Sequence, residues 1–212
     1  MFLVDDDDRI RTSLSRALDK RGYSVESFSS AEAFLEAFDP NRPGCLILDY
    51  GMPELNGLDL QKYLAQVKIS IPIVFISGQG GVPESVQAMK AGAIDFLEKP
   101  FRQRDLVACI ETAFARDLET RSADENTKIA RTKFDRLTAR EKEIALFMIT
   151  HPSTTSSKEV GRELDISPRT VDHHRARILE KMSIGSVAEL IDLSGSTALL
   201  ESDDLGDIDP LN

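Results

Sequence analysis

The first half of the chain alternates short apolar runs with segments of helical periodicity, and no other feature of the sequence limits the fold as strongly. Two of the runs, 45–48 and 73–76, are continuously apolar, as strands buried on both faces of a sheet should be. Strands are expected at 2–4, 24–28, 45–48, 73–76 and 94–97, and helices at 10–21, 31–38, 58–67, 83–91 and 104–115. This order predicts an α/β fold, a doubly wound five-stranded parallel sheet with helices on both faces.

The second half of the chain has no strand signals. From residue 101 to residue 151 there is neither Gly nor Pro, so the last helix of the sheet domain is expected to continue into the linker. Four short helices are expected after it, at 139–150, 157–164, 168–182 and 187–194. The predicted order is a sheet domain, a helical linker, an all-α four-helix domain and a disordered acidic tail, at 1–117, 118–132, 133–198 and 199–212.

The net charge of −10 is distributed unevenly along the chain. Residues 1–118 carry 13 basic and 18 acidic side chains, whereas residues 131–185 carry 11 basic and 8 acidic ones. The last 27 residues contain seven acidic residues and neither Lys nor Arg. This distribution indicates separate modules with separate partners, and the mildly basic block is compatible with nucleic acid despite the acidic total.

The lack of a targeting signal and the setting of the two cysteines both favour the cytoplasm. No apolar run approaches the roughly 20 residues of a membrane span, and no secretory signal pattern is present, so no membrane partner is expected. Cys45 and Cys109 both lie in apolar runs. They would allow a disulfide, but we expect two buried and reduced thiols.

Reactive side chains follow four of the five predicted strands. Asp5 and Asp6 follow the first strand, Asp49 the third, Ser77 the fourth and Lys99 the fifth. Because the carboxyl ends of parallel strands lie at one edge of the sheet, three carboxylates, a hydroxyl and an ammonium group are expected to meet there. Three carboxylates this close repel one another and need a cation, and all-oxygen ligation suits Mg²⁺. A carboxylate nucleophile beside Mg²⁺ is a route to an aspartyl phosphate.

Each acid or base has a simpler explanation when it is considered alone. Asp7 and Asp8 fit the start of the following helix, where negative charge is stabilising by about 0.3–1 kcal/mol. Asp49 alone could be an ordinary turn residue, and Lys99 alone a solvated surface charge. Their coincidence with a hydroxyl at successive strand ends favours the functional interpretation.

Residues 1–117 resemble a receiver domain of two-component signalling, which has a flavodoxin-like sheet. The segment 49–53, with Gly57 after it, resembles the phosphorylation segment of that family, and 98–101 resembles its lysine-containing loop. The resemblance implies that Asp49 is the phosphoacceptor. It implies that Ser77 and Lys99 contact phosphoryl oxygens, and that Phe96 is a switch aromatic that turns inward when Ser77 moves toward the phosphate.

The same resemblance implies a Mg²⁺ site, in which Mn²⁺ can substitute. Asp6, Asp49 and the backbone carbonyl of Gly51 would hold the ion, and Asp5 would bind it mainly through water. Gly51 departs from the family, which often has a larger side chain two residues after the phosphoacceptor. With no side chain to shield the phosphorus, we expect water to reach it more freely and the phosphoryl state to be short-lived.

The basic block contains start signals for two of its helices. Ser156 and Glu159 have the spacing of a capping box. Ser167 is placed to cap the next helix, with Pro168 at the first helical position. The short turn between these helices predicts a helix-turn-helix.

The second of these helices, at 168–182, has two different faces. At about 100° per residue, one face carries Val171, Arg175, Ile178 and Met182, with His174 and Leu179 at its margins. The opposite face carries Arg169, His173, Ala176, Arg177 and Glu180. A basic outer face of this kind suits reading of the DNA major groove, whereas the simpler alternative is a helical bundle with a solvated charged face.

The segments 137–141 and 166–171 resemble a LuxR-type DNA-binding domain, which favours the first alternative. With the receiver, residues 1–194 resemble the FixJ/NarL class of response regulators, in which 187–193 would belong to a dimerisation helix. The resemblance implies phosphate contacts from Lys158, Thr170, His174 and Arg175, and positions nearer the bases for Arg169, Asp172, His173 and Ala176. Arg177 joins this set from the outer face. The helical wheel and the resemblance disagree on Asp172 and Arg175.

The segment that connects the first two helices of this domain, the 150–157 link, is about three residues longer than is usual in the family. Two interpretations are open, an extra turn beside the DNA backbone or a surface loop without a role in binding. The sequence favours the surface loop.

The expected function is that of a transcription factor controlled by phosphorylation from a sensor histidine kinase. The protein would bind roughly palindromic double-stranded DNA as a homodimer, and would not be a turnover enzyme. A phosphatase with an aspartyl nucleophile would need a second Asp where Gly51 stands. A ligand-sensing LuxR-type regulator would need an acyl-lactone-binding domain, which relies on Trp, and the chain has none.

Overall fold

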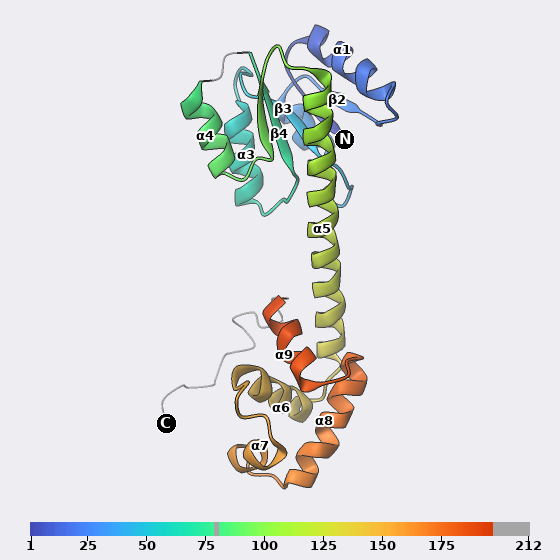
Figure 1. The fold of residues 1–212 in the computed structure, drawn as a ribbon, viewed down its shortest axis with the longest axis vertical. Coiled ribbons are helices and arrows are strands. Elements are labelled where there is room, and N and C mark those ends of the chain that lie inside the picture. The colour runs from blue at the N-terminus through green and yellow to red at the C-terminus, as the bar shows by residue number, and fades with distance from the viewer. Residues whose placement is uncertain (79–80, 197–212) are drawn as a thin grey trace. The chain divides into compact units, whose positions relative to one another are not determined.

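The computed structural model describes residues 1–78 and 81–196 (Figure 1). They belong to two compact units, Met1–Arg121 and Ser122–Asn212. The division falls inside the segment that the sequence assigned to the linker. The acidic tail expected at 199–212 lies outside the described residues.

The first unit is built on a parallel five-stranded sheet with the order β2-β1-β3-β4-β5. Its strands are β1 (Phe2–Val4), β2 (Glu26–Phe28), β3 (Leu46–Asp49), β4 (Ile73–Ser77) and β5 (Asp95–Glu98). Its helices are α1 (Asp8–Asp19), α2 (Ala31–Ala37), α3 (Gly57–Gln66), α4 (Val82–Lys90) and α5 (Gln103–Asp135). The predicted doubly wound sheet is confirmed, and the central strands β3 and β4 are buried along their whole length.

Each face of the sheet is covered by its own apolar core. Because side chains alternate across a strand, Leu46 and Leu48 pack on one face with α2, α3 and α4, while Ile47 packs on the other with α1 and α5. Figure 1 shows α3 and α4 on one side of the sheet and α1 and α5 on the other. Fully burying one Leu or Ile side chain contributes about 1.5–3 kcal/mol. These two cores hold the carboxyl ends of the strands in a fixed arrangement.

Two helix boundaries have a local cause: the start of α1 differs from the expected one, and the end of α5 lies beyond the linker. The first helix was expected to begin at Ile10, but it begins at Asp8 because the side chain of Asp7 accepts a hydrogen bond from the backbone N–H of Arg9 (2.8 Å). Helix α5 continues to Asp135, with no Gly or Pro to end it earlier. The continuation is the one expected from the sequence.

The second unit is all-helical. After the end of α5 it contains α6 (Ala139–Thr150), α7 (Ser157–Glu163), α8 (Pro168–Met182) and α9 (Val187–Ser196). All four predicted helices are present, and α5 contributes Ala130 and Phe134 to their shared core. Both predicted caps are confirmed, the capping box of Ser156 and the N-cap of Ser167.

Two further expectations can be compared with the described residues. Both cysteines are buried free thiols, as expected. Among residues 1–78 and 81–196, none of the helices has the length and apolar character of a membrane span.

Candidate functional site

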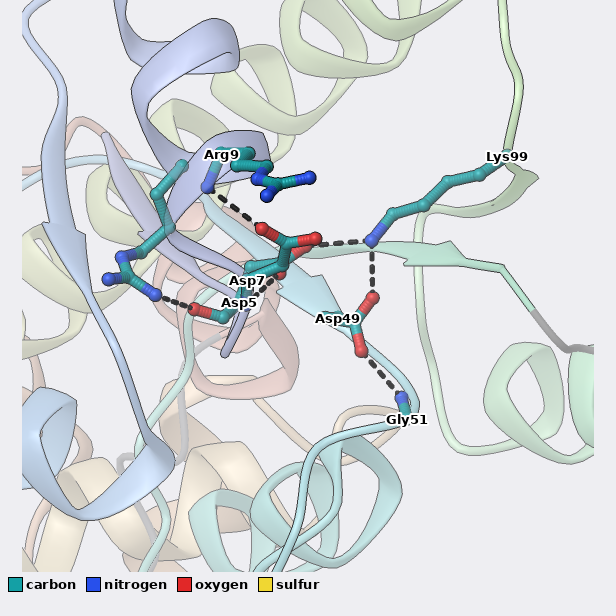
Figure 2. Close-up of polar contacts among 7 residues, drawn as sticks. Asp5, Asp7, Arg9, Asp49, Gly51 and Lys99 are labelled. Carbon is teal, nitrogen blue, oxygen red and sulfur yellow. Dashed lines mark hydrogen bonds and ion pairs between the residues drawn. The ribbon is translucent and has the colours of Figure 1, made fainter.

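An ammonium group bridges two buried carboxylates at the carboxyl edge of the sheet. The Nζ atom of Lys99 lies 2.7 Å from Oδ2 of Asp5 and 2.6 Å from Oδ1 of Asp49 (Figure 2). Asp5 follows β1, Asp49 is the last residue of β3, and Lys99 follows β5. Asp5 is 1% exposed and Asp49 is 6% exposed, so both charges are withdrawn from water and depend on Lys99.

Backbone groups fix the orientation of both carboxylates. The N–H of Gly51 donates to Oδ2 of Asp49 (2.7 Å), and the N–H of Asp7 donates to Oδ1 of Asp5 (2.8 Å) (Figure 2). The guanidinium of Arg11 donates to the backbone carbonyl of Asp5 (2.7 Å). Because both oxygens of each carboxylate are bonded, the two side chains are held before any reaction partner arrives.

The electrostatics of the cluster follow from its burial. Burial raises the pKa of the Asp5 carboxyl, and the hydrogen bond and charge of Lys99 offset this only in part. Burial alone would lower the pKa of Lys99, but its hydrogen bonds to Asp49 and Asp5 outweigh burial and raise that pKa. Lys99 is therefore a fixed cation at neutral pH.

Three other residues predicted at this edge, Ser77, Asp6 and Phe96, differ in their burial and in their contacts. Ser77 is buried at the end of β4, and its backbone carbonyl accepts a hydrogen bond from the N–H of Lys99 (2.7 Å). Asp6 is exposed and takes no part in the ion pair with Lys99. Phe96 is half-buried, with its ring 6.0 Å from that of Phe75 and 5.9 Å from that of Tyr50.

The donor set of this edge fits a hard divalent cation, although the described residues contain no group of three His, Cys, Asp or Glu side chains arranged around a metal position. The ammonium group of Lys99 already bonds two buried carboxylates, so this edge is a place where positive charge is stabilising. Carboxylate and carbonyl oxygens from Asp6, Asp49 and Gly51 are the donor types that Mg²⁺ prefers.

In the second unit, α8 presents the expected outer face. Val171, Ile178 and Met182 are buried in the core. The exposed residues of the predicted DNA-binding set are Lys158 of α7 and Arg169, Thr170, Asp172, His173, Ala176 and Arg177 of α8. This burial pattern agrees with the helical wheel.

Two residues of the predicted set are half-buried, His174 and Arg175. The guanidinium of Arg175 donates to the backbone carbonyl of Thr155, in the 150–157 link. Asp172 is exposed, and its carboxylate accepts a hydrogen bond from the hydroxyl of Ser157. The structure thus places Arg175 on the inner side of α8, as the wheel does, and the phosphate contact that the family resemblance implies for it is the alternative tested below.

Comparison with known families assigns a family to each of the two units. Residues 1–111 match the response regulator receiver domain, and residues 135–194 match the bacterial regulatory proteins of the luxR family. The chain is a response regulator. It combines a receiver domain with a LuxR-type DNA-binding domain, and this family of transcription regulators implies a sensor kinase and DNA as partners.

Relatives of this response regulator match it along most of their length. The response regulator protein TmoT of Ectopseudomonas mendocina is 40% identical over 191 residues, which are 90% of this chain and 86% of TmoT. The transcriptional regulatory protein FixJ of Rhizobium meliloti is 38% identical over 192 residues, which are 90% of this chain and 92% of FixJ. The solved structure of the response regulator StyR is 39% identical, with a TM-score of 0.76, and the match covers 92% of this chain and 96% of StyR.

Sequence reasoning on the receiver passed over the packing role of Gly57. A Cβ atom at this position would lie 2.4 Å from the backbone oxygen of Asp49 and 2.9 Å from the ring of Phe75. Only glycine lets α3 begin this close to the end of β3. Gly57 is part of the family motif, but its contact with the end of β3, which requires glycine, is visible only in three dimensions.

Proposed function

We propose that this response regulator binds DNA under the control of phosphorylation at Asp49 by a partner sensor histidine kinase. The observation that carries the proposal is the fixed carboxylate of Asp49, between the ammonium of Lys99 (2.6 Å) and the N–H of Gly51 (2.7 Å). A carboxylate at the open edge of a parallel sheet, held in place and paired with a cation, is suited to act as a nucleophile.

In the proposed reaction a carboxylate oxygen of Asp49 attacks the phosphorus of a phosphohistidine. The phosphorus–nitrogen bond breaks, its electron pair stays on the imidazole nitrogen, and Asp49 becomes an acyl phosphate. The phosphoryl group adds negative charge, so Lys99 exchanges its carboxylate partners for a phosphoryl oxygen, while the hydroxyl of Ser77 donates to another. The protein thereby assists its own phosphorylation and hydrolysis without being a turnover enzyme for an external substrate.

Mg²⁺, or Mn²⁺ in its place, would be held by Asp6, Asp49 and the backbone carbonyl of Gly51, with Asp5 acting through water. When bound, the ion supplies positive charge that offsets the charge of the transferring phosphoryl group. The exposed side chain of Asp6 is available for this role, because it makes no ion pair with Lys99.

The effect of phosphorylation would reach the rest of the receiver through movements of Ser77 and Phe96. When Ser77 bonds the phosphoryl group, the ring of Phe96 follows, and the face formed by α4, β5 and α5 changes its packing. We propose that this face then favours receiver dimerisation. Dimers read two half-sites, so the DNA site should be roughly palindromic.

The DNA surface is proposed to be the exposed face of α8, with Arg169, His173, Ala176 and Arg177 at the bases. Thr170 and His174, together with Lys158 of α7, would contact phosphate groups. Base contacts give sequence preference, and phosphate contacts fix the position of the helix on the duplex.

The test compares wild-type protein with Asp49→Asn and with Asp59→Asn, which changes an aspartate of α3 whose side chain is 46% exposed and paired with Lys62. Each protein is incubated with acetyl phosphate and Mg²⁺, and its DNA binding is measured by footprinting with and without the phosphodonor. We expect stimulation in the wild type and in Asp59→Asn, and none in Asp49→Asn. Stimulation that survives in Asp49→Asn would refute the role of Asp49.

A further inference from the structure

The 150–157 link is bound to α8 by two side chains of that helix. Arg175 donates from its guanidinium to the backbone carbonyl of Thr155. Asp172 accepts a hydrogen bond from the hydroxyl of Ser157, the first residue of α7. Both contacts join the middle of α8 to the segment that connects α6 to α7.

The link also has internal structure at its other end. The ring of His151 stacks on that of Phe147 in α6, with centroids 4.4 Å apart and an interplanar angle of 13°. The N–H of Thr154 donates to the carbonyl of His151 (2.9 Å) and closes a turn. The link is therefore a loop with one hydrogen-bonded turn, attached to α6 at one end and to α8 at the other.

The 150–157 link lies beside the exposed face of α8. At about 100° per residue, Arg169 and Ala176 lie within roughly 60° of Asp172 around the helix, and Arg175 lies at a similar angle on the other side. The link is therefore attached along the stripe next to the proposed base-reading residues. Its own exposed side chains include His151 and Ser153.

The side chain of Arg175 makes its hydrogen bond inside the protein. Its side chain is half-buried, its Nη2 atom is bonded to the link, and its Nε atom is buried with no hydrogen-bond partner in the described part of the chain. Leaving a buried polar atom unpaired costs stability. An arginine that reached a phosphate group would direct its guanidinium away from the domain, which this side chain does not do.

We propose that the 150–157 link is a second contact with the DNA backbone, and that Arg175 is a positioning residue that holds it there. Hydroxyl and imidazole groups bind phosphate oxygens, and the link offers them at His151, Ser153 and Thr154. The proposal rests on the proposed function, because it requires α8 to read DNA.

The salt dependence of binding separates a positioning residue from a phosphate contact. Each charged phosphate contact that is lost lowers the slope of log K against log salt by about 0.9. Full-length protein is titrated onto a mixed-sequence DNA duplex at several salt concentrations. Arg175→Gln removes the charge and leaves a shorter amide donor, so the wild-type slope is expected. Lys158→Ala, the matched control, should lower the slope by about 0.9.

Arg175→Ala removes the donor as well as the charge. We expect about 3-fold to 10-fold weaker binding, the range of one or two lost hydrogen bonds, with the slope unchanged. A double variant, Ser153→Ala with Thr154→Val, removes two hydroxyl groups without touching Arg175, and the same loss is expected. This variant keeps the proposal testable if circular dichroism shows that Arg175→Ala does not fold.

Two results would overturn the proposal while leaving DNA binding in place. The first is a slope that falls in Arg175→Gln as it does in Lys158→Ala, because Arg175 would then contact phosphate itself. The second is wild-type affinity in both Arg175→Ala and the hydroxyl double variant. Failure of the wild type to bind any duplex would instead refute the proposed function, and this inference with it.

Discussion

Lys99 pairs with two carboxylates that come from different strands, and this contact joins β1, β3 and β5 through their ends. Removal of one member of a buried ion pair leaves an uncompensated charge, which is far more costly than loss of a surface pair. Phosphorylation would give Lys99 a new partner on Asp49 itself. The same ammonium group therefore stabilises the resting site and would respond to the phosphoryl group.

Gly57 leads to the first prediction at the residue scale. Gly57→Ala places a methyl group 2.4 Å from the backbone oxygen of Asp49, so either α3 or β3 must shift. We expect the receiver to lose about 1–3 kcal/mol of stability, typical of overpacking, and Asp49 to accept phosphoryl groups poorly. Urea unfolding and phosphoprotein gels measure the two effects.

The matched control is Gly195→Ala, where an added Cβ meets nothing within 4 Å. This variant should be as stable as the wild type or slightly more so. Wild-type stability and phosphorylation in Gly57→Ala would show that the close approach of α3 to β3 is not required.

Glu141 leads to a prediction about pH. Burial alone would raise the pKa of this carboxyl, but hydrogen bonds from Lys181 (2.6 Å) and from the N–H of Thr138 (2.8 Å) outweigh burial and lower the pKa to about 2. A pKa that is lower in the folded state gives stability that is complete above the ordinary value near 4.5 and is lost as the pH falls toward about 2.

Glu141→Gln should therefore destabilise the DNA-binding unit by about 1–3 kcal/mol near neutral pH, and by clearly less near pH 3. Urea unfolding at the two pH values measures the difference. Glu143→Gln, which breaks only an exposed pair with Arg140, should cost less than about 0.5 kcal/mol. An equal cost of Glu141→Gln at both pH values would contradict the role of its charge.

At the residue scale, the sequence predicts well which residues come together. It predicts the geometry of their contacts less well. Asp5, Asp49 and Lys99 could be placed together because parallel strands end at one edge. That Asp6 stays outside the ion pair, and that Arg175 bonds the carbonyl of Thr155, depends on side-chain rotamers and loop paths. No spacing rule in the sequence determines these.

At the scale of elements, α5 belongs to both units. Its first part packs on the sheet through Leu106 and Ile110, and its last part fills the helical core through Ala130 and Phe134. The absence of Gly and Pro predicted the continuation of this helix. That its end becomes core could not be predicted, because the helix carries no single apolar stripe along its length.

Phe134→Ala tests the second attachment. Phe134 is 1% exposed, and truncation of a buried Phe to Ala typically costs about 3–5 kcal/mol. We expect thermal unfolding to begin in the DNA-binding unit and DNA binding to weaken accordingly. Ile129→Ala removes a side chain of the same helix that is 44% exposed, and should change stability by less than about 0.5 kcal/mol. Equal stability of both variants would show that Phe134 is not part of the core.

At the scale of the whole molecule, the two units have separate cores and separate tasks, and only the receiver contains cysteine. The chain has two cysteines, and both lie in the core between the sheet, α1 and α5. Burial is the largest cause that raises the pKa of each thiol to about 12, and Asp95 adds to the effect at Cys109. Thiol reagents attack the thiolate, so the native receiver should react very slowly with them.

This distribution of thiols gives the protein a built-in chemical reporter. Modification of Cys45 and Cys109, followed by mass spectrometry, records each opening of the receiver and none of the DNA-binding unit. Gly57→Ala should therefore speed labelling, whereas Phe134→Ala should leave it unchanged if the units open independently. Faster labelling in Phe134→Ala would instead reveal that the two units unfold together, and this coupling could then be measured without introducing any further cysteine.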